Sequence, residues 1–465
     1  MLPSEQLITT EDLSWAEIEF SGAEFGDNRL TNRLVHLTKD LSNNPEAAIN
    51  RASRDWSATK GAYRFFANEK VTPIKILSPH REQTLERIKR DESNYCLAIQ
   101  DTTFLNFNDH RACNGLGFIG STENLKVMIA HTTLACSVKG LPLGILEQKL
   151  YIRSEISTMS SREREKLPIS QKESVRWLES IRAITAAIDN TTTTTTTSSK
   201  EASSSSSEQK KIVTVCDREG DITELLVEAE KLNVGYLIRS SAPRKIISTE
   251  PHSKQNLHEA VKKAPIAANV QFLPATLGSS NGKLKKQGLP TFVVRVVAAK
   301  GKKTLEWFLL TNIAVNNIED AIERIRWYQL RWHIEIFHKI LKSGCTIEAV
   351  RLASVQKLNR CVTLYSIIAW RIFFLTHLQR ISPQVSANFV LSHIELQVLK
   401  KILYRKNSEI DISTLTGATK AIATLGGYMN RKNDPAPGPI VIWRGYTKLQ
   451  EAVLTAHALM ENTCG

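Results

Sequence analysis

Two short apolar runs that each end in an aspartate constrain the fold of this chain most strongly. The run LAIQD ends at Asp101, and the run VTVCD ends at Asp217. Runs of this kind are typical of strands buried on both faces, in a sheet that helices cover on either side. Apolar residues at helical spacing follow in 173–189 and 221–231. The pattern therefore predicts an α/β core with an acidic residue at the end of two strands.

The rest of the chain adds strands and helices to this core. Further strands are expected at 95–107, 127–138, 143–152, 234–241 and 305–312, from β-rich runs bounded by turn residues. The first 75 residues and the chain beyond about 350 have helical spacing instead. A segment rich in Lys, Ser, Pro and Gly, at 241–305, contains short β runs and predicts a small β insertion.

The charge of the chain points to a polyanionic partner. Its 465 residues include 61 Lys and Arg against 47 Asp and Glu, which gives a formal net charge of +14. Such an excess favours a nucleic acid as partner, although many basic proteins bind no anion specifically. The 42% hydrophobic and 23% charged residues exclude a mostly disordered or fibrous chain.

Several classes of protein are not indicated. The seven cysteines are scattered and never spaced as CxxC, which predicts reduced thiols in a cytosol. The first residues, MLPSEQLITTEDLSW, lack the basic start and apolar run of a signal peptide. The best apolar stretch, 364–377, is too short to span a bilayer and contains Arg371. Neither GxxxxGK[ST] nor HExxH occurs, so we expect a cytoplasmic protein with no membrane partner and no nucleotide cofactor.

One segment differs in composition from everything around it. Residues 190–207 read NTTTTTTTSSKEASSSSS, with almost no apolar side chain to bury. This composition predicts a solvated, mobile loop at 190–208, and a tolerated insertion explains it more simply than a phosphorylated or partner-binding tract.

A charged face is predicted on one long helix, at 318–343. At about 100° per residue, Tyr328, Arg331, Glu335 and Lys342 fall on one narrow side of it. Two interpretations remain open. The face is either a structural ion-pair cluster, worth little at a surface, or a metal ligand flanked by cations that bind phosphate oxygens.

The acidic residues indicate a metal site only when they are considered together. Asp101 or Asp217 alone is more simply a turn or N-cap residue. Three carboxylates from distant segments, with Glu335 as the third, suit Mg²⁺, which takes oxygen ligands. A pair of such ions assists in-line displacement at phosphorus by acting on the attacking and the leaving oxygen. The metal-assisted displacement at phosphorus and the basic net charge then both indicate a nucleic acid as the partner.

The same residues resemble a known family. The spacing Tyr-x2-Arg-x3-Glu-x6-Lys is the helix signature of the bacterial insertion-sequence transposases with an Asp-Asp-Glu (DDE) triad, in the IS-four group, and the chain meets it at every position. Short sequence motifs similar to those of the family occur along essentially the whole chain: GDNRLTNRL, GAYRFFAN, IQDTT, VCDREGD, WFLLT, RWHIEIFHK, LGGYMNRK and IVIWRGYTKLQ.

This resemblance implies an α/β fold with an RNase H-like catalytic core, a β-strand insertion, and helical domains at both ends. The implied domains are a DNA-end-binding domain at 1–75, the first part of the core at 76–240, the insertion at 241–305, the second part of the core at 306–375, and a dimerisation region at 376–465. The low-complexity tract is a departure from the family, and it leaves the triad intact.

The resemblance also implies roles for single residues. Asp101, Asp217 and Glu335 would be catalytic and would bind two Mg²⁺, which Mn²⁺ can replace. DNA contacts are implied for Tyr328, Arg331, Lys342, Trp307, Arg239, Arg29, Arg33, Arg64 and Lys339. Trp307 matches a tryptophan that stacks on a flipped base, whereas its place in an apolar strand by itself predicts a core aromatic.

The implied activity is cut-and-paste DNA transposition through a hairpin intermediate, carried out by a homodimer in a synaptic complex. Its partners would be double-stranded DNA, both the terminal inverted repeats and the target, within a bacterial cytoplasm and nucleoid. Two alternatives stay open: a structure-specific Mg²⁺ nuclease that cuts without joining, and an inactive descendant that only binds DNA or dimerises.

Overall fold

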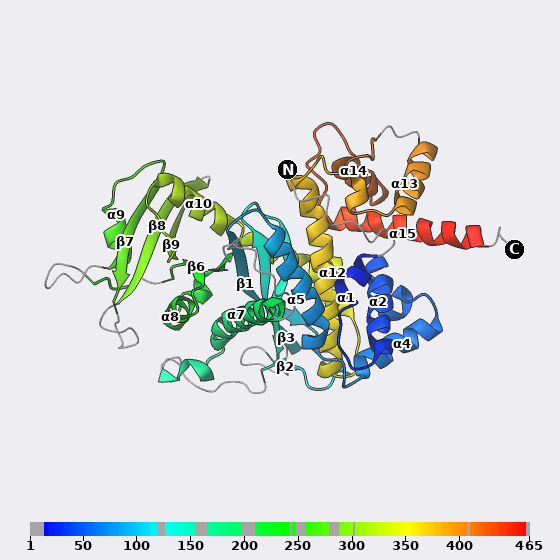
Figure 1. The fold of residues 1–465 in the computed structure, drawn as a ribbon, viewed down its shortest axis with the longest axis horizontal. Helices are drawn as coiled ribbons and strands as arrows, with labels where there is room; N and C mark the ends of the chain where they lie inside the picture. The colour runs from blue at the N-terminus through cyan, green and yellow to red at the C-terminus, as the bar shows by residue number, and fades with distance from the viewer. Residues whose placement is uncertain are drawn as a thin grey trace.

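The computed structural model describes residues 14–110, 112–118, 126–153, 163, 166–196, 210–241, 244–247, 256–278, 288–300, 303–406 and 410–461. Figure 1 shows a central sheet flanked by helices, a strand-rich extension on one side of it, and two groups of helices on the other.

Five strands form the centre of the sheet. They are β1 (Tyr95–Asn106), β3 (Lys126–Ser137), β4 (Pro142–Tyr151), β5 (Lys211–Cys216) and β6 (Gly235–Arg239). β1 pairs antiparallel with β3 and parallel with β5, β3 pairs antiparallel with β4, and β5 pairs parallel with β6. The resulting order, β4-β3-β1-β5-β6, is that of an RNase H-like core. The predicted α/β core is therefore confirmed.

The insertion extends this sheet instead of forming a separate one. Its strands are β7 (Val270–Leu277), β8 (Leu289–Lys300) and β9 (Lys303–Thr311), with the short helix α9 (Leu257–Lys262) beside them. β9 pairs antiparallel with both β8 and β6, and with β2 (Gly117–Phe118) the sheet has nine strands. The boundary expected near residue 305 thus passes through β9, because this strand serves the core and the insertion together.

Helices cover both faces of the core, and the alternation of side chains along each strand separates the two interiors. Leu97 and Ile99 of β1 face one apolar cluster, together with α11 (Trp332–Lys339) and α12 (Val355–Ile381). Cys96 and Ala98 face a second cluster. That cluster includes α7 (Val175–Thr196), α8 (Thr223–Lys231) and the end of α5 (Pro73–Arg90). Burial on both faces explains the continuous apolar runs in the sequence.

The helix expected at 318–343 is not continuous, which corrects that prediction. α10 (Ile318–Gln329) ends at Leu330, α11 begins at Trp332, and the last turn, Ile340–Gly344, is a π-helix. The turn between α10 and α11 and the π-helical last turn both change the angle between successive side chains. The single narrow face calculated for an ideal helix therefore does not extend along the whole of 318–343.

The low-complexity tract also departs from its prediction. Helix α7 continues through Thr196, so the first seven residues of the tract are helical where a loop was expected. Threonine is a poor helix former, but a helix that is already nucleated adds one hydrogen bond for each further residue. The remainder of the tract, 197–208, lies outside the described residues.

Two groups of helices lie beside each other at the end of the molecule opposite the insertion (Figure 1). The N-terminal group comprises α1 (Trp15–Phe20), α2 (Asn28–Asn43), α3 (Ile49–Ala52) and α4 (Trp56–Ala67). The C-terminal group comprises α13 (His393–Arg405), α14 (Leu415–Leu425) and α15 (Pro439–Glu461). They are linked directly, because Arg444 Nε lies 3.3 Å from a carboxylate oxygen of Glu46.

Helix α12 runs through the middle of the molecule. It is long and apolar enough to cross a membrane by length and composition, but 83% of its most apolar window is buried within the protein. Trp370 on α12 is 1% exposed and donates its indole N–H to the carbonyl of Pro142 at 2.8 Å. The helix is thus a core element that joins the sheet to both helical groups.

Candidate active site

Asp101 lies on β1, on the sheet face toward α11. Its side chain is 18% exposed, and one carboxylate oxygen accepts the backbone N–H of Thr102 at 2.8 Å. Burial raises the pKa of Asp101 to about 6, and the negative charges of Asp217 and Glu335 raise it further, against the effect of Arg331. The three predicted acidic residues therefore act on one another electrostatically, which requires them to be close in space.

Asp217 follows β5 immediately. Strands β1 and β5 are parallel, with Ile99 opposite Val215, so Asp101 and Asp217 both lie two residues beyond this pair, toward the same end of the two strands. β1 itself continues beyond Asp101, so this residue lies within its strand and does not end it as predicted. Asp217 also caps a short 3-10 helix, because its carboxylate accepts the backbone N–H of Glu219 at 2.8 Å. The N-cap role offered by the sequence is real, and it coexists with a place in the acidic cluster.

Glu335 is held by an arginine one helical turn before it. The Arg331 guanidinium donates to Glu335 at 2.6 Å and lies 4.0 Å from a carboxylate oxygen of Asp101. Among the described residues, no three acidic, histidine or cysteine side chains form a ready-made metal site. Arg331 itself supplies the positive charge that the carboxylates need in this conformation.

Three more predicted residues gather at the same place. Tyr328 packs edge-to-face against Trp307 with ring centroids 5.1 Å apart, and the Arg239 guanidinium lies 5.9 Å from the Trp307 ring centre. Burial raises the pKa of Tyr328 to about 12, although Arg331 and Arg239 act against this shift. Trp307 is half-buried, and its indole N–H is buried without a partner. It is neither a full core residue nor a fully exposed one.

The other predicted DNA contacts lie elsewhere. The charge of Lys342 adds to the effect of burial in lowering the pKa of His338. Among the described residues, Lys342 has no contact with the acidic cluster, and Lys339 is exposed. Arg29 and Arg33 lie on α2 and Arg64 on α4, far from the cluster along the chain and in the N-terminal helices. The structure thus divides the predicted residues between the sheet edge and the N-terminal group.

A buried polar network that the sequence did not predict lies behind the two aspartates. Arg176 of α7 donates to the Thr102 hydroxyl at 3.0 Å, and this hydroxyl also bonds to Nδ1 of His131 at 2.9 Å. Nε2 of the same histidine bonds to Gln100, whose amide donates to the Thr214 hydroxyl at 2.8 Å. No sequence signal distinguishes Arg176, since it is one of many charged residues on a helix.

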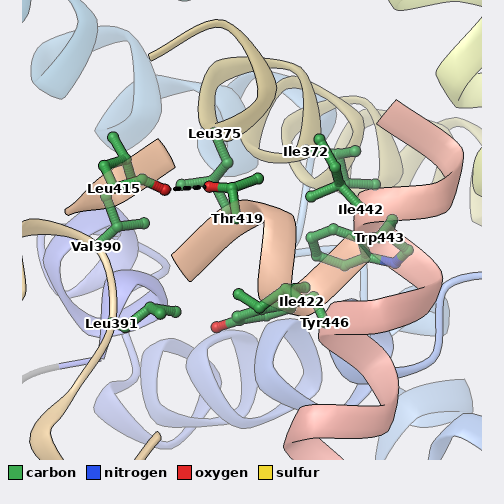
Figure 2. A pocket seen from close by; sticks show the side chains of 10 residues that line it. All are labelled: Ile372, Leu375, Val390, Leu391, Leu415, Thr419, Ile422, Ile442, Trp443 and Tyr446. Atoms are coloured by element: carbon green, nitrogen blue, oxygen red, sulfur yellow. Dashed lines mark hydrogen bonds between the residues drawn. The ribbon is translucent and has the colours of Figure 1, made fainter. Parts of the chain in front are cut away.

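A small cavity lies among α12 and the C-terminal helices. Figure 2 shows it between α12, α14 and α15, lined by Ile372, Leu375, Val390, Leu391, Leu415, Thr419, Ile422, Ile442, Trp443 and Tyr446. Its volume is about 20 Å³, enough for roughly one water molecule. The Thr419 hydroxyl is already bonded to the Leu415 carbonyl at 2.7 Å. The cavity is a packing defect of the C-terminal helices.

Comparison with known families supplies a context for this geometry. Residues 12–71, which include α1 to α4, match the family described as Transposase DNA-binding. Residues 367–460, from the middle of α12 into α15, match the family described as Transposase Tn5 dimerisation domain. The two matches support a Tn5-like transposase. The acidic cluster lies on the core between these two matched segments.

A solved structure is also similar to this chain. It is described as the cryo-EM structure of the piggyBac transposase synaptic complex with hairpin DNA. The sequences are 11% identical, and the match has a TM-score of 0.34. It covers 88% of this chain and 63% of the other, so the present chain spans less than two thirds of that structure's length.

Proposed function

We propose that this protein is a DNA transposase that excises a mobile element and inserts it elsewhere by cut-and-paste. The observation that carries the proposal is the convergence of Asp101, Asp217 and Glu335 at one edge of an RNase H-like sheet, between segments similar to transposase DNA-binding and dimerisation domains. The protein would act on DNA in the cytoplasm, at the nucleoid.

The chemistry of the site fits magnesium. Three carboxylates offer the oxygen ligands that Mg²⁺ prefers, and the pKa of Asp101 is raised first by its burial and then by the negative charges of Asp217 and Glu335. We propose that these three residues hold two Mg²⁺, or Mn²⁺ in their place. When bound, such ions supply an activated oxygen and stabilise the leaving oxygen in displacement at phosphorus.

The residues of the chain would then have the following tasks. Glu335 would give up its bond with Arg331 when it helps to hold the metal, and the guanidinium would then be free to bind a phosphate oxygen of the DNA. Arg239, Tyr328 and Trp307 line the neighbouring surface. Trp307 would stack on a base extruded during hairpin formation, with Tyr328 supporting its ring from the side.

The two helical groups would bring the DNA to this site. Arg29, Arg33 and Arg64 would contact the terminal repeats together with the exposed cations around them, and Lys342 and Lys339 would contact phosphates near the cleaved end. Pairing of two ends requires two copies, so we propose a homodimer in the synaptic complex, formed through the C-terminal helices that match the dimerisation family.

The test is cleavage and joining of DNA that carries the repeats flanking the coding region, with Mg²⁺. Asp101→Asn, Asp217→Asn and Glu335→Gln are expected to lower cleavage at least about 100-fold while DNA binding remains. Glu319→Gln is the matched control, because Glu319 is an exposed acid on the adjacent α10.

The products decide between the remaining candidates. Strand-transfer products support the transposase, whereas cleavage without joining would identify a structure-specific nuclease. If the three variants cleave as well as the native chain, the assignment of the acidic residues is wrong. If the native chain binds but never cleaves, it is a DNA-binding descendant.

A further inference from the structure

Both aspartates of the site are held in the same indirect way. Asp101 accepts the backbone N–H of Thr102, and Asp217 accepts the backbone N–H of Glu219, each at 2.8 Å. These two amide-bearing residues have something else in common. Their side chains both bond to the guanidinium of Arg176, at 3.0 Å for the Thr102 hydroxyl and 3.1 Å for the Glu219 carboxylate.

Arg176 reaches these partners from behind the sheet. Thr102 points to the face opposite Asp101, because successive side chains of a strand alternate, and that face is covered by α7. The third guanidinium nitrogen donates to the carbonyl of Glu173 at 3.0 Å, which fixes the guanidinium to the turn just before the helix. With its side chain only 11% exposed, Arg176 has little freedom to choose other partners.

The buried network next to Arg176 makes its bond to Thr102 directional. Burial, aided by the charge of Arg176, lowers the pKa of His131 well below its ordinary value, so this ring is neutral. A consistent set of donors follows. Arg176 donates to Thr102, the Thr102 hydroxyl donates to Nδ1 of His131, and Nε2–H donates to Gln100. Each group can serve as donor or acceptor in only one way, which is expected of a rigid, fully satisfied network.

We propose that Arg176 is a positioning residue that sets the separation of Asp101 and Asp217, by tying together the two backbone segments whose amides hold these carboxylates. It touches neither the DNA nor the reacting atoms. The inference rests on the proposed function, because it assigns Arg176 a purpose in preparing the acidic site for metal. Its structural content, one guanidinium joining two segments, does not depend on that function.

The chain offers a matched control on the same helix. Arg182 also lies on α7 and forms a bond of the same kind, from its Nε to Glu228 of α8 at 2.7 Å, away from the acidic cluster. Arg176→Met and Arg182→Met each remove one guanidinium and keep the length of the apolar stem. Only the first is expected to loosen the two aspartate segments.

The test is backbone hydrogen exchange of the full chain without metal or DNA, read by mass spectrometry on peptides covering 101–106 and 217–221. Arg176→Met is expected to speed exchange in both peptides at least about 3-fold, and Arg182→Met in neither. Faster exchange in only one peptide, or equal effects of the two variants, would overturn the inference.

A metal titration gives the second readout. The Mn²⁺ concentration for half-saturation is expected to rise about 10-fold or more in Arg176→Met and to stay unchanged in Arg182→Met. Unchanged affinity despite faster exchange would also overturn the positioning role. If the native chain neither binds Mn²⁺ nor cleaves DNA, the proposed function has failed, and the exchange result still decides whether Arg176 joins the two segments.

A pair of variants at Glu219 covers the case in which Arg176→Met does not fold. Glu219→Gln keeps an oxygen acceptor for the guanidinium and is expected to behave like the native chain. Glu219→Ala removes the acceptor and is expected to speed exchange at 217–221 and to weaken Mn²⁺ binding. Equal behaviour of the two variants would contradict the proposal, since Glu219 is 62% exposed and has no packing role to lose.

Discussion

At the scale of single residues, burial and two neighbouring carboxylates disfavour the charged form of Asp101, and Arg331 offsets this only in part. Asp101 keeps its proton up to a pH of about 6 in the folded chain, because it is buried and lies near Asp217 and Glu335. An unfolded aspartate loses its proton near pH 3.9. The folded state therefore binds the extra proton between these values, and the free energy of unfolding falls as the pH rises from about 4 to about 6.

Replacing this carboxylate is consequently expected to stabilise the metal-free protein. At pH 7.5, Asp101→Asn is expected to raise the free energy of unfolding by roughly 2–3 kcal/mol, and at pH 4 the difference should largely vanish. Urea denaturation in EDTA at both pH values measures this. Glu319→Gln is the control, and a destabilised Asp101→Asn at pH 7.5 would show that its negative charge is favourably compensated.

Arg331 allows a second prediction at this scale, because its bond to Glu335 would compete with the proposed metal. Arg331→Ala removes a cation bonded to one proposed ligand and 4.0 Å from another. Mn²⁺ affinity without DNA is expected to rise about 10-fold, while DNA cleavage falls about 100-fold through loss of a phosphate contact. Arg331→Lys should change both quantities less. A parallel fall of affinity and cleavage would contradict the competition.

At the scale of elements, a buried ionic cluster docks the first helix onto the core. Glu19 of α1 pairs with His80 of α5, and it accepts two hydrogen bonds from Arg87 at 2.9 and 3.1 Å. Burial alone would raise the pKa of Glu19, but the charge of Arg87 and the hydrogen bonds from Arg87 and His80 outweigh it and lower the pKa to about 2. The pair thus stabilises the folded state above pH 4.5, and that contribution is lost as the pH falls toward 2.

Removing this charge leaves the partly buried Arg87 without a carboxylate partner. Glu19→Gln is expected to cost about 3–5 kcal/mol of stability at pH 7, and less near pH 3. The midpoint of denaturant unfolding measures the loss. Glu86→Gln is the matched control, because Glu86 forms an exposed pair with Lys89 on α5 and should change stability by less than about 1 kcal/mol. Equal losses would show that α1 docks without this cluster.

The helices and strands also show how much of the fold the local sequence pattern predicts. The apolar strands and their order of appearance follow from alternation and burial, and they were predicted within a few residues. The break at Leu330 and the π-helix at Ile340–Gly344 were not, because both obey the packing of α11 against α12 and the sheet rather than helix propensity.

At the scale of the whole molecule, the excess of positive charge predicts DNA affinity that falls steeply with salt. Arg29→Ala and Arg64→Ala are each expected to weaken binding to the terminal repeats and to reduce the slope of log affinity against log salt by about 1. Arg29 is 91% exposed and Arg64 is exposed on α4, so both are accessible to phosphates.

Fluorescence anisotropy at several salt concentrations measures these slopes. Lys89→Ala is the control, since Lys89 is a half-exposed cation on α5, outside the segment that matches the DNA-binding family. A slope that drops equally in all three variants would mean that charge acts non-specifically over the surface, without a defined contact at the N-terminal helices.

The sequence by itself determined the chemistry: which carboxylates follow the apolar runs, which cations precede and follow Glu335, and which segments form the sheet. These features are local, because strand burial and helical spacing depend on neighbours along the chain. Only the tertiary structure decided that Arg331 lies beside Asp101, that β9 joins the insertion to the core, and that Arg176 connects Thr102 to Glu219. Those contacts join residues from separate elements, and their geometry depends on how whole helices pack against the sheet.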